Sequence, residues 1–157
     1  MLVPMRVTLL SACFLLFLFA CKNKPGSGKD NAATTQSGAE PPAGFMDFYR
    51  KFHEDSLYQI AHITWPLRGE STEQVDAGHT KKVLETWEPE TWRMHRPVDF
   101  SSGDFKREFE VMGDAMVIER ISFVAANYAL ERRFYLNENG EWELIYYADM
   151  QEITHNY

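Results

Sequence analysis

Aromatic residues at the start of the folded part of the chain recur with the period of an α-helix. Four of them fall on one stripe: Phe45, Phe48, Tyr49 and Phe52. Polar residues fill the positions between them, so this pattern predicts an amphipathic helix over residues 45–54. A second, shorter helix is expected over residues 57–61, because Asp55 or Ser56 can accept hydrogen bonds from its first backbone N–H groups.

The segment that follows is richer in β-branched and aromatic residues. Residues 62–65 predict a short strand, which Pro66 is expected to end because proline has no backbone N–H for a strand ladder. Residues 67–78 are polar and contain glycine, which predicts a loop or a polar hairpin tip. A strand over residues 81–87 follows, and a Glu-Pro-Glu start then predicts a short helix over residues 88–95.

Strand-like patterns continue almost to the end of the chain. Four strands are predicted, over residues 105–111, 116–124, 128–136 and 141–149. Their connections are short and turn-like, which predicts an antiparallel meander. The expected fold is therefore α+β, with two or three N-terminal helices packed on a curved antiparallel sheet.

A different pattern occupies the first 21 residues. Arg6 precedes an apolar run from Leu9 to Phe19, which is too short to span a bilayer and fits the central region of a signal peptide. Ala20 and Cys21 follow, and this ending resembles the lipobox of bacterial lipoproteins. The resemblance implies cleavage before Cys21, diacylation of its sulfur and acylation of the new amine. Two points of lipidation suffice for stable anchoring.

Three regions result from these patterns. Residues 1–20 form the lipoprotein signal peptide, and residues 21–44 contain the lipidated cysteine and a flexible tether rich in small and polar residues. Residues 45–157 form one domain, because their length suits one core and not two. The domain contains no cysteine, so neither a disulfide nor a thiolate zinc site stabilises it.

The charge of the chain excludes one class of partner. It contains 16 lysine and arginine residues against 23 acidic residues, a formal net charge of −7. Such a surface repels nucleic acid and anionic lipid headgroups. Attachment to a membrane is therefore expected through the lipid on Cys21 and not through a basic patch.

A resemblance to a known family begins in the helical region. Its motif is Phe48-x3-Phe52-x2-Asp55-x2-Tyr58-Gln59-x2-His62-Ile63-x-Trp65-Pro66-Leu67. This segment resembles a family of lipidated envelope proteins that carry domain of unknown function 4348, although His62 stands where those proteins carry arginine or lysine. The resemblance implies a nuclear transport factor 2-like (cystatin-like) fold, a cone whose helices pack on a bent sheet and leave one end open. Such cones host enzymes, dimers and binding modules, so the fold does not define a function.

Several residues are candidates to line a pocket in such a cone: His62, Trp87, Trp92, Tyr128, Tyr146, Tyr147 and Asp149. Asp149 is either a base at the rim of the pocket or a solvated residue at the end of a strand. Tyr146 and Tyr147 point to opposite faces of the sheet, so at most one of them faces a pocket. Trp87 and Trp92 either plug the open end of the cone or form a stacking platform for a sugar or an aromatic ligand.

Other charged residues are better explained by structure. Glu119 is a further candidate carboxylate, but Arg120, Arg132 and Arg133 are expected to pair with Glu119 and Glu131 in a cross-strand ladder. The histidines lack metal-binding spacing and the glycines form no phosphate loop, so neither a metal nor a cofactor is expected.

Two functions remain open. The first is a lipid-anchored binding module of the cell envelope, in the outer membrane facing the periplasm, that takes a small ligand or another envelope protein. The absence of an aspartate after Cys21, where Lys22 stands, favours the outer membrane. The alternative is a cone-type isomerase or hydrolase acting on an apolar substrate. A homodimer formed through the outer face of the sheet is a further hypothesis.

Overall fold

The computed structural model describes residue 38 and residues 40–152, all of which belong to one compact unit. The predicted signal peptide, Cys21 and most of the predicted tether lie outside the described residues. Within the described part, none of the helices has the length and apolar character needed to cross a membrane.

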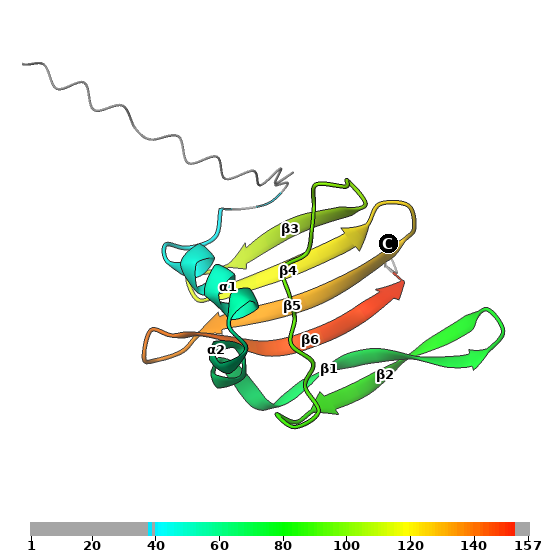
Figure 1. The fold of residues 1–157 in the computed structure, drawn as a ribbon, viewed down its shortest axis with the longest axis horizontal. Coiled ribbons are helices and arrows are strands. Elements are labelled where there is room, and N and C mark those ends of the chain that lie inside the picture. Colours follow the sequence, from blue (N-terminus) through cyan, green and yellow to red (C-terminus); the bar gives the residue numbers. More distant parts are fainter. Residues whose placement is uncertain (1–37, 39, 153–157) are drawn as a thin grey trace, which may run out of the picture. The chain divides into compact units, whose positions relative to one another are not determined.

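The two predicted N-terminal helices are present. Helix α1 spans Phe45–Glu54 and helix α2 spans Ser56–Ala61 (Figure 1). Asp55 is the N-cap of α2, because its carboxylate accepts hydrogen bonds of 3.0 Å from the backbone N–H groups of Leu57 and Tyr58.

Six strands form one sheet: β1 Ile63–Asp76, β2 His79–Trp87, β3 Phe105–Met112, β4 Met116–Phe123, β5 Tyr128–Leu136 and β6 Trp142–Glu152. Their order is β2-β1-β6-β5-β4-β3. Among the strands that the structure describes, β3, β4, β5 and β6 form the predicted antiparallel meander, but β1 and β6 pair in parallel. The expectation of an antiparallel sheet was wrong in this respect. The sheet is mixed because β1 joins the meander beside its last strand and runs in the same direction.

Strand β1 continues past the point where the sequence predicted its end. Pro66 is exposed and lies where the pairing with β6 shifts between Ile63 and Arg68, so its missing N–H disrupts no regular part of that ladder. The Trp65–Pro66 peptide bond is cis. Of the two alternatives for residues 67–78, the polar hairpin is confirmed and the loop is wrong: these residues are the outer part of a long β1–β2 hairpin that turns at residues 77–78. It is polar on both faces because most of it extends beyond the part that pairs with β6.

The predicted short helix over residues 88–95 was also wrong. Residues Glu88–Thr91 form one turn, and the chain then crosses the helix-bearing face of the sheet to reach β3 (Figure 1). We call residues 88–104 the strap. The helical turn does not continue past Thr91, and the strap is bonded to α2 where Nε1 of Trp92 and the backbone N–H of His95 both donate to Gln59.

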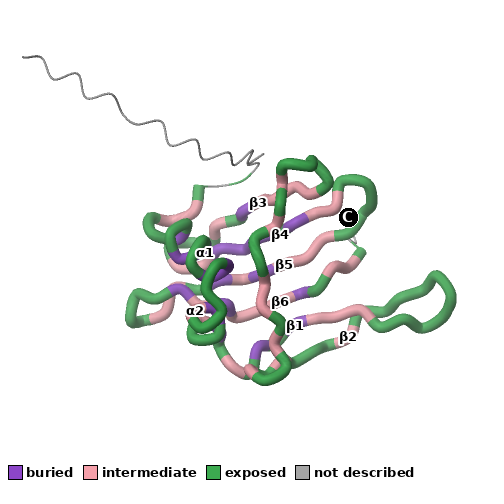
Figure 2. Tube along the Cα trace, in the orientation of Figure 1, coloured by how far each residue is buried: buried purple, intermediate pink, exposed green. Residues whose placement is uncertain are grey.

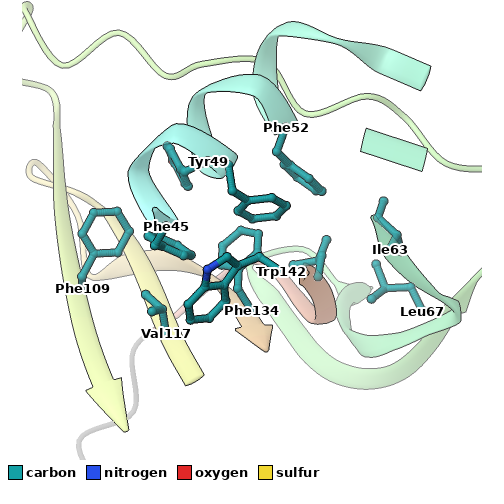
Figure 3. Close-up of a cluster of buried hydrophobic side chains, with 11 residues drawn as sticks. Phe45, Tyr49, Phe52, Ile63, Leu67, Phe109, Val117, Phe134 and Trp142 are labelled. Carbon is teal, nitrogen blue, oxygen red and sulfur yellow. The ribbon is translucent and has the colours of Figure 1, made fainter. Parts of the chain in front are cut away.

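The core lies between α1 and the sheet, where buried positions concentrate (Figure 2). Phe45 is fully buried, and the rings of Phe134 and Trp142 meet it edge-on at centroid distances of 5.5 and 5.0 Å (Figure 3). The aromatic stripe of α1 therefore faces the sheet, as the helical spacing predicted. Burying such large rings supplies most of the free energy that holds the helix on the sheet.

Candidate functional site

Four of the residues predicted to line a pocket meet in one cleft of about 220 Å³: Trp87, Trp92, Tyr147 and Asp149. Five further residues complete its lining: Ser71, Glu85, Thr91, Arg93 and His95. We call this the aromatic cleft. Its walls come from β1, β2, β6 and the strap, four segments that are far apart in the sequence. The strap brings Thr91, Trp92, Arg93 and His95 into a site whose other residues belong to the sheet.

Three rings form the walls of the aromatic cleft at steep angles to one another. The centroids of Trp87 and Trp92 lie 6.3 Å apart with an interplanar angle of 81°, and those of Trp92 and Tyr147 lie 5.8 Å apart at 86°. Trp87 and Tyr147 lie 5.2 Å apart at 60°. All three side chains are half-buried. The rings therefore form a corner and not a pair of parallel plates.

Gly69 allows this corner to form. A Cβ atom at this position would lie 1.6 Å from the carbonyl oxygen of Tyr147 and 2.9 Å from the Trp87 ring. Only glycine lets β1 approach β6 so closely behind the two aromatic walls.

Two carboxylates line the aromatic cleft. The Tyr147 hydroxyl donates a hydrogen bond of 3.0 Å to Oδ1 of Asp149, and the Met150 backbone N–H donates one of 2.7 Å to the same oxygen. Burial and the neighbouring Asp149 raise the pKa of Tyr147, which keeps the hydroxyl protonated as a donor. Ser71 donates a hydrogen bond of 3.2 Å to Oε2 of Glu85. In each carboxylate one oxygen accepts these hydrogen bonds, and the other oxygen can accept a hydrogen bond from a further group.

The hydrogen bond from Arg132 fixes the tautomer of His95. Nε of Arg132 donates a hydrogen bond of 3.1 Å to Nδ1 of His95, and a guanidinium can only donate. The ring proton of neutral His95 is therefore on Nε2. Burial and the charge of Arg132 lower the pKa of His95 to about 2, so the ring stays neutral at physiological pH. His95 offers the aromatic cleft an N–H group without a charge.

Gln59 holds the strap over the sheet. Its Oε1 accepts hydrogen bonds of 2.9 Å from Nε1 of Trp92 and 2.8 Å from the backbone N–H of His95. Its Nε2 donates to the carbonyl oxygens of Phe52 and His95 at 2.7 and 2.9 Å. The sequence interpretation missed Gln59 as a site residue, although the Tyr58-Gln59 pair of the family motif marked it.

A buried polar chain leads from the aromatic cleft into the core. Arg132 donates a hydrogen bond of 2.9 Å to Oε2 of Glu119, and the Tyr49 hydroxyl donates to Oε1 of the same carboxylate. Glu119 is 0% exposed and Arg132 is 3% exposed. Burial and the adjacent carboxylate raise the pKa of Tyr49, so it remains a donor. Glu119 thus orients the guanidinium of Arg132, and this guanidinium in turn orients the ring of His95.

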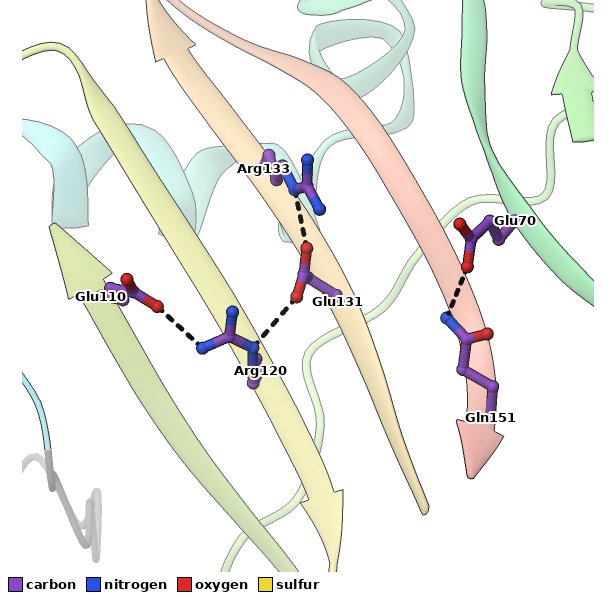
Figure 4. A network of polar contacts seen from close by, with 6 residues as sticks. All are labelled: Glu70, Glu110, Arg120, Glu131, Arg133 and Gln151. Carbon is purple, nitrogen blue, oxygen red and sulfur yellow. Dashed lines mark hydrogen bonds and ion pairs between the residues drawn. The ribbon is translucent and has the colours of Figure 1, made fainter. Parts of the chain in front are cut away.

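The exposed face of the sheet carries the predicted ionic ladder. Arg120 contacts Glu110 and Glu131 at 2.8 and 3.0 Å, and Arg133 contacts Glu131 at 2.7 Å (Figure 4). Arg132 also pairs with Glu119 across β4 and β5 as predicted, at 2.9 Å, but this pair lies on the opposite, buried face. Pairs that are half exposed contribute little to stability, whereas a broken buried pair is costly.

The remaining predicted pocket residues lie elsewhere. His62 stacks on Tyr58 at 3.7 Å in a second cleft of about 620 Å³ beside α1 and α2. Tyr146 lies on the outer face, where the Arg133 guanidinium is 4.1 Å from its ring, so Tyr146 and Tyr147 do point to opposite faces. Tyr128 is 40% exposed at the start of β5.

In the part of the chain that the structure describes, no group of three or more histidine, cysteine or acidic residues is arranged to hold a metal ion.

Acidification is expected to destabilise the domain, because two histidines are kept neutral inside it. Burial, and next the charge of Arg132, lower the pKa of His53 from 6.5 to about 4 and that of His95 to about 2. Below pH 6.5 the unfolded chain binds protons on both rings, whereas the folded chain does not until the pH reaches the lowered pKa values. The free energy of unfolding should therefore fall by about 1.4 kcal/mol per histidine for each pH unit between about 6.5 and 4.

Urea denaturation of the wild-type chain and of a His53→Gln variant, between pH 7 and pH 4, checks this expectation. The variant should lose less stability on acidification than the wild type, whatever its stability at pH 7. Identical slopes for the two proteins would show that His53 is not held neutral.

Comparisons with known proteins identify the fold. The chain is similar to an NTF2-like protein from Bacteroides fragilis, with 17% identity and a TM-score of 0.51 over 73% of this chain and 50% of that protein. It therefore spans about half the length of that relative. A cystatin-like protein from Bacteroides caccae is 17% identical over 69% of this chain and 79% of its own, with a TM-score of 0.49. No family model matches the chain, and no curated protein is similar to it in sequence.

The domain thus has an NTF2-like α+β fold, a curved mixed sheet of six strands with two short helices. This confirms the fold that the family resemblance implied. At this level of identity the comparison concerns the fold alone.

Proposed function

We propose that the chain is a lipid-anchored cell-envelope protein of the family with domain of unknown function 4348, and that its domain binds a small ligand in the aromatic cleft. The observation that carries the second part is the meeting of three half-buried rings, two carboxylates and a neutral histidine in one cleft. Clefts that combine aromatic walls with a few oriented polar groups are typical of ligand sites.

The alternative of a cone-type enzyme has less support. It requires a desolvated carboxylate that faces the substrate and acts as a base. Glu119 is fully buried, but its two oxygens are occupied by Tyr49 and Arg132. Asp149 faces the aromatic cleft, but it is exposed and already accepts two hydrogen bonds.

Ligand binding is tested by thermal unfolding of the full chain in detergent, with a panel of chemically diverse small molecules. A ligand present at about 100 times its dissociation constant should stabilise the folded chain by about 2.7 kcal/mol. The Trp87→Ala variant should lose this response, because it removes one wall of the aromatic cleft.

The matched control is Tyr135→Ala, which removes a 40% exposed ring from the outer face of β5. It should respond to the ligand as the wild type does. A ligand that stabilises Trp87→Ala and the wild type equally would place its site outside the aromatic cleft.

The proposed anchor is tested in a host that processes lipoproteins. Labelled palmitate should be incorporated into the wild-type chain and not into a Cys21→Ser variant, since the thioether to the lipid needs the sulfur. The labelled chain should fractionate with outer membranes. Equal labelling of both proteins, or an intact unacylated amino terminus in mass spectrometry, would contradict this part of the proposal.

A further inference from the structure

We infer that the aromatic cleft takes one saturated sugar ring, a neutral hexose unit, and not a flat aromatic compound. This inference rests on the proposed function, because it names the class of ligand for the same cleft. It is drawn from the shape of the cleft, its hydrogen-bonding groups, its charge and its size.

The shape of the aromatic cleft disfavours flat ligands. A planar aromatic molecule is held best between two parallel faces, whereas the rings here meet at 81°, 86° and 60°. A corner of this kind suits a ligand with apolar surface in more than one direction. The two faces of a pyranose ring carry C–H groups, and its edge carries hydroxyls, so it can contact one ring face-on and turn its edge to polar groups.

The polar groups of the aromatic cleft match hydroxyls. Glu85 and Asp149 offer acceptor oxygens, while Nε2–H of His95 and the guanidinium of Arg93 offer donors. A hydroxyl both donates and accepts, so neighbouring hydroxyls on one ring can satisfy fixed donors and fixed acceptors together. Glu85, Arg93 and Asp149 are exposed, so the sugar hydroxyls would replace the water that hydrates these groups.

The charge of the aromatic cleft disfavours an anionic ligand. The net charge of the chain, −7, opposes anions, including acidic sugars. Arg93, which lines the same cleft, offsets one of the two carboxylates, whereas the charge of Arg132 is already neutralised by Glu119. The charge therefore disfavours an anionic ligand, and the choline probe described below tests a cationic one.

The size of the aromatic cleft limits the ligand to one ring. Its volume of about 220 Å³ is below the roughly 300–1,000 Å³ of sites for drug-sized molecules. A single hexose fits this space, and further sugar units of a chain would extend into solvent.

Fluorine NMR of the full chain in detergent, labelled with 5-fluorotryptophan, tests the inference. The chain contains four tryptophans, and three of them report on the two clefts. Trp87 and Trp92 line the aromatic cleft, whereas Trp142 lines the second cleft beside α1. The probes are the methyl glycosides of glucose, galactose, mannose and N-acetylglucosamine at millimolar concentration, together with choline and indole.

At least one glycoside should shift the signals of Trp87 and Trp92 and leave that of Trp142 in place. Its affinity should fall about tenfold in Asp149→Ala, the effect of losing one hydrogen bond to a charged group. The matched control is Glu131→Ala on the outer face, which should bind the glycoside as tightly as the wild type.

Two results would overturn the inference. If choline or indole shifts the Trp87 and Trp92 signals and no glycoside does, the ligand class is wrong but the aromatic cleft remains a binding site. If none of the probes shifts these signals, the sugar inference fails, and the proposed function is then decided by the wider panel of the thermal-unfolding experiment.

Discussion

Replacing Arg132 by methionine is expected to lower the free energy of unfolding by about 3–5 kcal/mol. The substitution leaves Glu119, which is 0% exposed, as a buried carboxylate that keeps only its bond from Tyr49. It also removes the hydrogen bond to Nδ1 of His95 and so weakens the attachment of the strap. Urea denaturation followed by circular dichroism measures the loss.

The neighbouring residue provides the control. Arg133 is half exposed and pairs with Glu131 on the outer face at 2.7 Å, so Arg133→Met should cost less than about 1 kcal/mol. The double variant Glu119→Leu/Arg132→Met should recover much of the loss, because no unpaired charge is then left inside. Similar losses for Arg132→Met and Arg133→Met would refute the role given to the buried pair.

The second large effect is expected for Phe45→Ala, which should destabilise the domain by about 3–5 kcal/mol. Phe45 is fully buried, and its ring meets those of Phe109, Phe134 and Trp142 edge-on at 5.0 to 5.7 Å. Alanine would leave a cavity between α1 and the sheet that rigid aromatic neighbours cannot close. The same urea experiment measures the change.

Met46 is the matched control for this substitution. It follows Phe45 on the same helix but is 38% exposed, and alanine is a good helix former, so Met46→Ala should change the stability by no more than about 0.5 kcal/mol. If Phe45→Ala were equally mild, the helical stripe would not form the core.

The parts of the fold that follow a regular period were predictable from the sequence. The stripe on α1 shows the 3.6-residue period, and the short turns between β3, β4, β5 and β6 leave those strands only one simple arrangement. The outer half of β1 was predicted only as a loop or a hairpin tip, because it is polar on both faces and so lacks the alternation that marks a half-buried strand.

The strap escaped prediction for a different reason. Its path depends on Gln59 and Arg132, which bond to His95 across 36 and 37 residues of sequence. A Glu-Pro-Glu start is a valid local signal for a helix, but these long-range hydrogen bonds override it, since a turn of helix is weak on its own.

The candidate site was predictable in part. Trp87, Trp92, Tyr147 and Asp149 were chosen for their chemistry, and the structure brings these four together. Tyr128 and Tyr146 have the same kind of side chain as Tyr147 but lie outside the aromatic cleft, because residue type does not reveal which face of a strand meets the strap. His62 also lies outside it, at the C-terminal end of α2. His95 was missed, since nothing in its own sequence neighbourhood marks it. The lipidation of Cys21 stays a prediction.

The most direct test of the way the aromatic cleft is built is the protonation state of His95 in solution. Its imidazole ¹⁵N shifts can be measured in the full chain between pH 8 and pH 4 and assigned with a His95→Gln variant. The expected result is a neutral ring with its proton on Nε2 throughout this range, because Nδ1 accepts from Arg132 and burial lowers the pKa to about 2. A ring that gains a proton near pH 6.5, or that carries its proton on Nδ1, would show that the strap does not rest on Arg132 and that the cleft is not formed as described.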